Sequence, residues 1–326
     1  MEARLVERAH IPFKSIPAAG VHGVNIKTLP GNIFQLVRGF FAAKRILHDF
    51  KPDVLFFTGG YVAVPMALAG MNIPTALYVP DIEPALALKT LARFADKIAV
   101  TAQESFNYFT HRERLTLTGY PTRSDLTKWT RTNARQALHL NDDAPVLLVF
   151  GGSKGARSIN NAVLANLSTL LELTQIIHIT GELDWPTVES KVKELTGALA
   201  TRYHAYSYLH EEMGAALAAA DLVVSRAGAS TLGEYPLFGL PAVLVPYPYA
   251  WRYQKVNADA LVRRGAALIV TDSKLKVDLL PTVKGLLQNP SRLNSMRTAA
   301  KSLSNPKAAT EIGHLLLDLA GRRNKS

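Results

Sequence analysis

Short runs of Val, Ile and Leu alternate with helical patterns along most of this 326-residue chain. Such alternation is typical of parallel strands joined by helices that cover both faces of a sheet. The predicted strands lie at 54–57, 75–79, 97–101, 146–150, 175–180, 203–206, 221–225, 241–245 and 267–270. We therefore expect an α/β fold of doubly wound parallel sheets, in which ligands bind at the carboxyl ends of the strands.

The length of the chain predicts two domains, because a single core stops growing at about 250–300 residues. A polar stretch from Thr122 to Ala144 interrupts the alternation and contains a short predicted helix. We place an N-terminal domain at 1–130, a C-terminal domain at 131–305 and a final helix at 306–326 that packs back toward the first domain. The two Rossmann-like domains would face each other across a cleft.

One segment, Val54 to Pro80, has no charged residue over 27 positions and is long enough to suggest a membrane span. Glycines and prolines divide it, among them Gly59, Gly60 and Pro74, so we predict buried strands and a helix instead. The chain has no cysteine, which fits a reducing compartment. Its first residues carry no apolar run behind a basic cap, so we expect no signal peptide.

The net charge of +11 predicts attraction to polyanions. Residues 1–51 contain eight Lys or Arg against three Asp or Glu. Within them, 33–48 reads as a helix that mixes aromatic residues with Arg38, Lys44 and Arg45, and it would either lie on an anionic membrane surface or dock on a sheet with its basic residues facing water. We favour docking for most of its length. No nucleic-acid recognition motif is present, so we expect no nucleic-acid partner.

The segment 221–234 carries the clearest chemical signal. A strand leads into the small residues Ala227, Gly228 and Ala229, and a helix opens at Ser230-Thr231 with Glu234 one turn inside. Small residues let backbone amides approach a diphosphate at a helix amino terminus, and an acidic residue just inside the helix can bind the hydroxyls of a ribose. The alternative is that Thr231 and Glu234 form a capping box that only finishes the helix.

A second turn, Gly151-Gly-Ser-Lys-Gly-Ala156, follows the strand at 146–150 and precedes a helix from Arg157. Its spacing matches neither a Walker A loop nor Gly-x-Gly-x-x-Gly. It offers a glycine turn with the hydroxyl of Ser153 toward the same sheet edge as Gly228. Gln254 and Asn257 follow a proline-rich loop, and together these features predict a nucleotide site in the C-terminal domain.

The motifs resemble those of the MurG-type N-acetylglucosaminyltransferases, a family with the two-domain GT-B fold, and they span essentially the whole chain in the family's order. The matching segments are Thr58-Gly-Gly-Tyr-Val62, Ala92-Arg-Phe-Ala-Asp96, Gly119-Tyr-Pro-Thr-Arg123, Gly151-Gly-Ser-Lys-Gly-Ala-Arg157, Thr180-Gly181, 220–231, Glu234, Gly239-Leu-Pro241 and Gln254-x-x-Asn257.

The resemblance implies a reaction at the cytoplasmic face of the bacterial cell membrane. N-acetylglucosamine would pass from its uridine diphosphate donor (UDP-GlcNAc) to undecaprenyl-pyrophosphoryl-muramoyl-pentapeptide, with inversion at the anomeric carbon, in peptidoglycan synthesis. It implies a peripheral membrane enzyme that needs no cofactor or metal, because the helix terminus takes the place of a cation. An Asp-x-Asp motif is absent, and Asp81-Ile-Glu83 is the nearest carboxylate pair.

The resemblance also implies roles for individual residues. Ser153 and the amides of Gly228, Ala229, Ser230 and Thr231 would hold the diphosphate, and Glu234 the ribose. Main-chain groups near Leu209 and His210 would pair with uracil, and Gln254 would contact the sugar hydroxyls. The remaining residues expected at the donor site are Arg123, Arg226, Asn257 and, most weakly, Asp81.

Two departures from the family pattern affect this interpretation. Family members usually carry His-Glu-Gln-Asn where this chain has Tyr78-Val-Pro-Asp81, so Asp81 stands in for the asparagine. The family also opens with a strand, a glycine turn ending in histidine, a helix and a second strand, and Met1 aligns just after that unit. We therefore expect an incomplete N-terminal domain and name no catalytic base. A lone histidine such as His178 is more often structural.

Two other functions stay open. One is another GT-B enzyme that uses a uridine-diphosphate sugar, such as a glycolipid synthase or an epimerase. The other is a catalytically silent protein that only binds the nucleotide sugar.

Overall fold

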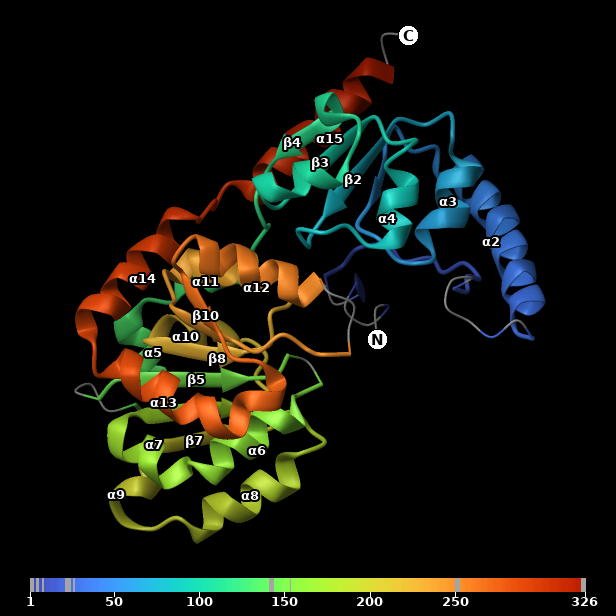
Figure 1. Cartoon of the computed structure of the whole chain (residues 1–326). Coiled ribbons are helices and arrows are strands. Elements are labelled where there is room, and N and C mark those ends of the chain that lie inside the picture. The colour runs from blue at the N-terminus through green and yellow to red at the C-terminus, as the bar shows by residue number, and fades with distance from the viewer. Residues whose placement is uncertain are drawn as a thin grey trace.

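The computed structural model describes residues 3, 6–7, 9–20, 25, 27–140, 144–152, 154–249 and 253–323. Figure 1 shows two lobes, each built around one sheet of parallel strands. The predicted architecture of two parallel-sheet α/β domains is therefore confirmed.

The N-terminal sheet has the strand order β1-β2-β3-β4. Its strands are β1 (Leu55–Phe57), β2 (Thr75–Val79), β3 (Lys97–Val100) and β4 (Leu115–Leu117). One face of this sheet is covered by α2 (Leu29–Phe50), α3 (Ala63–Ala69) and α4 (Leu86–Leu91), and the other by α15 (Ala308–Arg323). The 3-10 helices η1 (Gln103–Tyr108) and η2 (Arg112–Arg114) join β3 to β4.

Side chains alternate across this sheet, because successive residues of a strand point to opposite faces. Leu77 and Val79 of β2 pack into the core beneath α3 and α4, whereas Ala76 and Tyr78 pack against Ile312 and other apolar residues of α15. The last helix of the chain thus completes the core of the first domain.

The C-terminal sheet has the order β10-β9-β8-β5-β6-β7. Its strands are β5 (Val146–Phe150), β6 (Gln175–Ile179), β7 (Tyr203–Tyr206), β8 (Leu222–Ser225), β9 (Ala242–Leu244) and β10 (Ala267–Ile269). The helices of this domain are α5 (Arg131–Ala137), α6 (Arg157–Ala165), α7 (Leu167–Leu173), α8 (Trp185–Glu194), α9 (Gly197–Ala200), α10 (Met213–Ala219), α11 (Thr231–Phe238), α12 (Tyr253–Arg263), α13 (Leu275–Leu287) and α14 (Pro290–Ser302), with 3-10 turns η3 (Ser124–Lys128) and η4 (Asp272–Lys274).

All nine predicted strands are present, within one residue at either end. The missed strand is β4, which forms the edge of its sheet. Thr116 and Leu117 are exposed there, so β4 has no apolar run for a sequence pattern to reveal.

The chain crosses between the lobes after β4, near Thr118, and again after α14, near Asn305. These crossings touch, because Asn305 Nδ2 donates a hydrogen bond to Thr118 O at 2.9 Å. Arg264 at the end of α12 also reaches the other domain and pairs with Glu104 at 3.0 Å. No helix in the described part of the chain is long and apolar enough to cross a membrane.

Candidate nucleotide-sugar site

The two turns singled out in the sequence meet at the topological switch point of the C-terminal sheet. From β5 the sheet continues through β6 and β7 on one side and through β8, β9 and β10 on the other. Phe150, the last residue of β5, pairs with Ser225, the last residue of β8, so the turns that follow begin side by side. Crevices of this kind bind ligands in open α/β sheets.

The turn after β8 presents free backbone donors. The amides of Gly228, Ala229 and Ser230 donate to no other group among the described residues. A Cβ added at Gly228 would meet no atom of the described residues within 4 Å, so that side of the turn is uncrowded. The amide of Thr231, which we also expected to contribute, donates to Gly228 O at 3.1 Å instead.

The capping-box alternative is wrong for this turn. The N-cap of α11 is Ser230 rather than Thr231, and among the described residues no side chain caps the helix. The Thr231 hydroxyl donates to Gly228 O at 2.7 Å, which tightens the turn. The carboxyl group of Glu234 is therefore not used to finish the helix in the way a capping box requires.

Glu234 is half-buried beside the domain junction. Burial raises the pKa of Glu234 above its usual range, while a hydrogen bond from the Ser230 hydroxyl and the charge of Arg123 act in the opposite direction. Arg123 is exposed and also pairs with Asp125 at 3.6 Å. An acidic group in this position can accept hydrogen bonds from sugar hydroxyls.

Arg226 faces away from the open side of the turn. Its guanidinium donates to Asp272 at 2.5 Å, to Ser158 Oγ at 2.9 Å and to Val245 O at 3.1 Å, and it lies under the ring of Tyr247. These contacts tie the turn after β8 to α6, β9 and η4. Arg226 thus holds the turn after β8 in place, and no local sequence pattern indicated its distant partner Asp272.

The glycine turn after β5 packs against the turn after β6. Gly152 and Gly155 have positive φ values of 89° and 74°, which favour glycine. A Cβ at Gly155 would lie 2.2 Å from Thr180 O, so no other residue fits that approach. Ser153, expected at the diphosphate, lies outside the described residues.

Gln254 fixes the loop that follows β9. Its Oε1 accepts a hydrogen bond from Tyr247 N at 2.9 Å. Tyr249 is 86% exposed and contacts the ring of Tyr247 edge-on. Stiffening of the loop is therefore one role of this glutamine, alongside its predicted contact with the sugar.

Asn257 is fully buried and joins the two domains. Its Nδ2 donates to Asp81 Oδ1 at 2.8 Å and to Ala227 O at 3.2 Å, and its Oδ1 accepts from Ile82 N at 3.1 Å. The loop after β2 is thus attached, through Asn257, to Ala227 in the turn after β8. Burial raises the pKa of Asp81, and the hydrogen bond from Asn257 opposes this rise.

Leu209 and His210 lie in the loop between β7 and α10, at the carboxyl edge of the sheet. Leu209 packs against the core, and His210 is exposed beside the ring of Tyr208. Their backbone is placed at the rim of the sheet edge that carries the two turns.

Tyr120 is a junction residue that the sequence patterns did not single out. A Cβ at Gly233 would lie 2.7 Å from Tyr120 Cβ, so Tyr120 can pack against α11 only because residue 233 has no side chain. Burial and the nearby carboxyl groups of Glu234 and Asp81 raise the pKa of Tyr120. The glycine within the first turn of a predicted helix was the available signal for this close approach.

His178 is structural, as expected. It is fully buried, with Nδ1 at 2.8 Å from Tyr203 OH and Nε2 at 3.0 Å from Asn160 Oδ1. Asn160 in turn donates to Thr180 O at 2.9 Å, which supports the turn after β6. Burial lowers the pKa of His178 to about 3, so the ring is neutral near pH 7.

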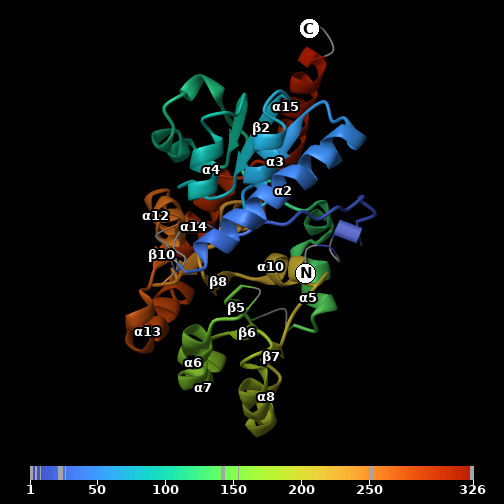
Figure 2. The same ribbon diagram turned by 90° about the vertical axis from the view of Figure 1, so that its right-hand side faces the viewer.

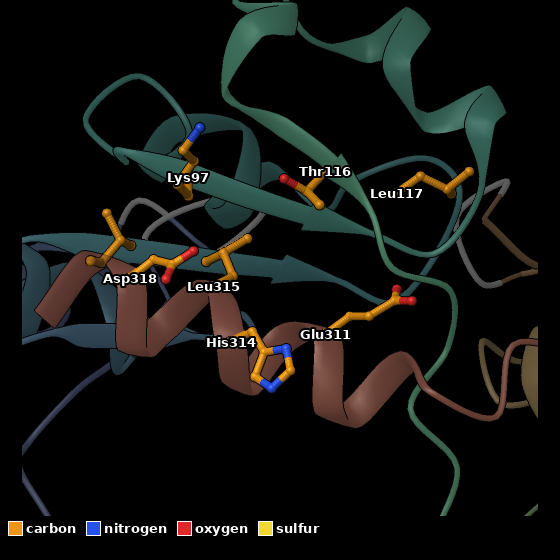
Figure 3. A pocket seen from close by; sticks show the side chains of 8 residues that line it. Lys97, Thr116, Leu117, Glu311, His314, Leu315 and Asp318 are labelled. Atoms are coloured by element: carbon orange, nitrogen blue, oxygen red, sulfur yellow. The ribbon is translucent and has the colours of Figure 1, made fainter. Parts of the chain in front are cut away.

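Two hollows lie beside these elements. A cavity of about 350 Å³ between the domains is lined by residues of both, including Ile82, Thr101, Leu232 and Leu261. A groove of about 480 Å³ runs between the β3–β4 edge and α15, where Lys97 and Thr116 lie opposite His314 and other α15 side chains (Figure 3). This groove belongs to the N-terminal sheet, whereas the two turns belong to the C-terminal one.

The described residues contain no group of three or more His, Cys, Asp or Glu side chains placed to hold a metal.

The comparisons with known proteins agree with this geometry. Residues 1–100 match the glycosyltransferase family 28 N-terminal domain, and residues 146–312 match the C-terminal domain of the same family. A protein of Roseiflexus sp. (strain RS-1) named UDP-N-acetylglucosamine--N-acetylmuramyl-(pentapeptide) pyrophosphoryl-undecaprenol N-acetylglucosamine transferase is 41% identical over 99% of this chain and 82% of its own. A protein of the same name from Desulforamulus reducens is 38% identical over 96% of this chain and 86% of its own.

Solved structures share the fold. The crystal structure of Acinetobacter baumannii MurG aligns with a TM-score of 0.72 at 26% identity, covering 98% of this chain and 88% of that one. A UDP-GlcNAc 2-epimerase from Neisseria meningitidis, bound to UDP-GlcNAc, aligns with a TM-score of 0.68 at 14% identity, covering 97% and 88%. The likeness to the epimerase shows the fold alone.

The two parallel-sheet domains, joined at a buried asparagine, have the GT-B fold, and both domains match a glycosyltransferase family, so the protein is a GT-B glycosyltransferase. The chain belongs to glycosyltransferase family 28 and, within it, to the MurG-type N-acetylglucosaminyltransferases.

Proposed function

We propose that this protein transfers N-acetylglucosamine from UDP-GlcNAc to undecaprenyl-pyrophosphoryl-MurNAc-pentapeptide, with inversion at the anomeric carbon. The observation that carries the proposal is the turn at Gly228 at the switch point, in a chain of this family: three successive amides there donate to no described group, and the Cβ position of Gly228 is uncrowded. Relatives named for this reaction match nearly the whole chain at 35–41% identity.

The donor would lie across the carboxyl edge of β5 and β8. The amides of Gly228, Ala229 and Ser230 would bind the β-phosphate, with Ser153 on its other side. Glu234 would accept hydrogen bonds from the ribose hydroxyls. The backbone near Leu209 and His210 would pair with uracil, and Gln254 would contact the sugar.

The chemistry would depend on stabilising the leaving group. As the glycosidic bond breaks, negative charge develops on the β-phosphate oxygen. Backbone donors at the amino terminus of α11 would be held at that position before the charge appears, so little reorganisation would be needed. Arg226 keeps these donors in place through its bonds to Asp272 and Ser158.

The acceptor is carried on a lipid, and α2 supports contact with an anionic membrane surface. The helix docks on the domain through Gly39 and Ala43, which are buried. Its outward side is not purely basic: Phe34 and Phe41 are 61% and 65% exposed, and Arg38 lies over the Phe34 ring at 5.9 Å. Apolar and basic side chains in one stripe suit the interface of an anionic bilayer. Figures 1 and 2 show α2 beside α3 on the outside of the N-terminal lobe.

The test begins with calorimetric titration of the full chain with UDP-GlcNAc. Labelled UDP-GlcNAc is then incubated with the lipid-linked muramoyl-pentapeptide in anionic vesicles, and the products are separated. We expect labelled lipid-linked disaccharide and free uridine diphosphate. Conversion of the donor without lipid would support an epimerase, and binding without turnover would support a silent binding protein; either result would contradict the proposal.

A further inference from the structure

The proposed reaction needs a group that accepts a proton. The attacking hydroxyl of the acceptor sugar loses its proton as its oxygen bonds to the anomeric carbon, and a positioned side chain usually takes that proton. The group must lie on the acceptor side of the cleft and close to the diphosphate turn.

We propose that the Asp81 carboxylate is the proton acceptor in this chain, and this inference rests on the proposed function. Asp81 follows β2 at the carboxyl edge of the N-terminal sheet and faces the C-terminal domain. Its Oδ1 accepts a hydrogen bond from Asn257 Nδ2, and the same nitrogen donates to Ala227 O, next to Gly228. A single amide group thus holds the carboxylate beside the expected position of the breaking bond.

The other oxygen of Asp81 is available. Among the described residues Oδ2 has no hydrogen-bond partner, and no Lys, Arg or His forms an ion pair with this carboxylate. The neighbouring carboxylate, Glu83, is by contrast buried and forms an ion pair with Lys89 at 3.0 Å. Glu234 lies on the donor side and is engaged by Ser230 and Arg123.

The surroundings make Asp81 a stronger base than an exposed carboxylate. The groups that face it are the amide of Asn257 and the phenols of Tyr78 and Tyr120. Desolvation raises the pKa of Asp81, and a carboxylate with a raised pKa accepts a proton more readily. Where family members usually have an asparagine, this chain therefore carries a group that can titrate.

The step is balanced. The acceptor O–H bond breaks and its proton moves to Asp81 Oδ2, while the freed oxygen forms a bond to the anomeric carbon. The bond from that carbon to the β-phosphate oxygen breaks, and its electron pair stays on uridine diphosphate. Asp81 then returns the proton to water.

The test compares Asp81→Asn and Asp81→Glu with the unchanged full chain, in the vesicle assay and in calorimetry with UDP-GlcNAc. Asparagine keeps an oxygen that accepts from Asn257 but cannot take up the proton. We expect Asp81→Asn to lower kcat by about 10²- to 10⁴-fold, the usual contribution of general base catalysis. The Kd for UDP-GlcNAc should change far less than kcat, because the backbone donors of the turn at Gly228 are unchanged and Asp81 is the most weakly expected of the donor contacts. Asp81→Glu keeps a carboxylate and should retain more activity than Asp81→Asn.

The pH dependence of kcat separates a base from a residue that only positions the loop. In the unchanged chain kcat should rise with pH through the raised pKa of Asp81, and this acid limb should disappear in Asp81→Asn. Full activity of Asp81→Asn, equal losses in both variants, or an acid limb that persists in Asp81→Asn would overturn the inference. Should the unchanged chain bind no donor or transfer no sugar, the proposed function fails first and the inference falls with it.

Discussion

Replacing Gly228 with Val is the sharpest test of the phosphate turn. The valine side chain would occupy the uncrowded side of the turn, where a Cβ meets no atom of the described residues within 4 Å. The φ angle of Gly228 is not positive, so an L-residue fits without backbone strain. The folded protein should thus accept the change, while the β-phosphate should not fit beside it.

The magnitude follows from the bonds at risk. A hydrogen bond to a charged group contributes about 1.5–3 kcal/mol. Each bond that the phosphate loses should therefore raise the Kd for uridine diphosphate by about 10- to 150-fold. The free energy of unfolding should change by less than about 1 kcal/mol, as for other uncrowded sites.

Calorimetric titration with uridine diphosphate and denaturant unfolding give the two quantities separately. Gly285→Val is the control, because a Cβ at Gly285 also meets no atom of the described residues within 4 Å, and Gly285 lies in α13 rather than in the turn before α11. Normal affinity in Gly228→Val would refute the phosphate-turn interpretation. A large loss of stability in this variant alone would show that the space is not open.

Three further outcomes are expected. Glu234→Ala should weaken uridine diphosphate binding by about 1–3 kcal/mol, the cost of leaving polar partners unpaired, and unchanged affinity with a lower melting temperature would contradict a ribose contact. The pKa of His178 is about 3 in the fold, so as pH falls below about 6.5 only the unfolded chain takes up a proton at this ring. The free energy of unfolding should therefore fall by about 1.4 kcal/mol per pH unit between pH 6 and 4. Chemical denaturation of His178→Gln should lack this contribution, and the same pH dependence in both proteins would show that His178 titrates normally. Sedimentation with anionic vesicles should fall steeply with added salt if the basic residues of α2 dominate, and Phe34→Ser with Phe41→Ser should weaken it further; binding that depends on neither would remove α2 from the interface.

Much of the fold was predictable because its signals are local. The buried strands β5 and β8 are continuous apolar runs, and the small residues that follow each of them mark turns wherever the sheet places them. The turns were expected at the same sheet edge, and the pairing of Phe150 with Ser225 shows that their strands are neighbours.

The contacts that complete the site could not be read from local patterns. Asp81 and Asn257 are 176 residues apart in sequence, and Arg226 and Asp272 are 46 apart. No short-range pattern links such partners, because their meeting depends on how the domains and loops pack. The same limit applies to Tyr120, whose position depends on a glycine in a helix of the other domain.

The hydrogen bond between Asn305 and Thr118 has a mechanical consequence. Because the two covalent connections lie together, they form one hinge, and one lobe can rotate about it relative to the other without stretching either connection. Contacts between the lobes away from this hinge, such as the hydrogen bond from Asn257 to Asp81, would have to break for the lobes to open. Opening to admit substrates would then also release the carboxylate from its amide partner, and each new cycle would restore that pair as the lobes come together.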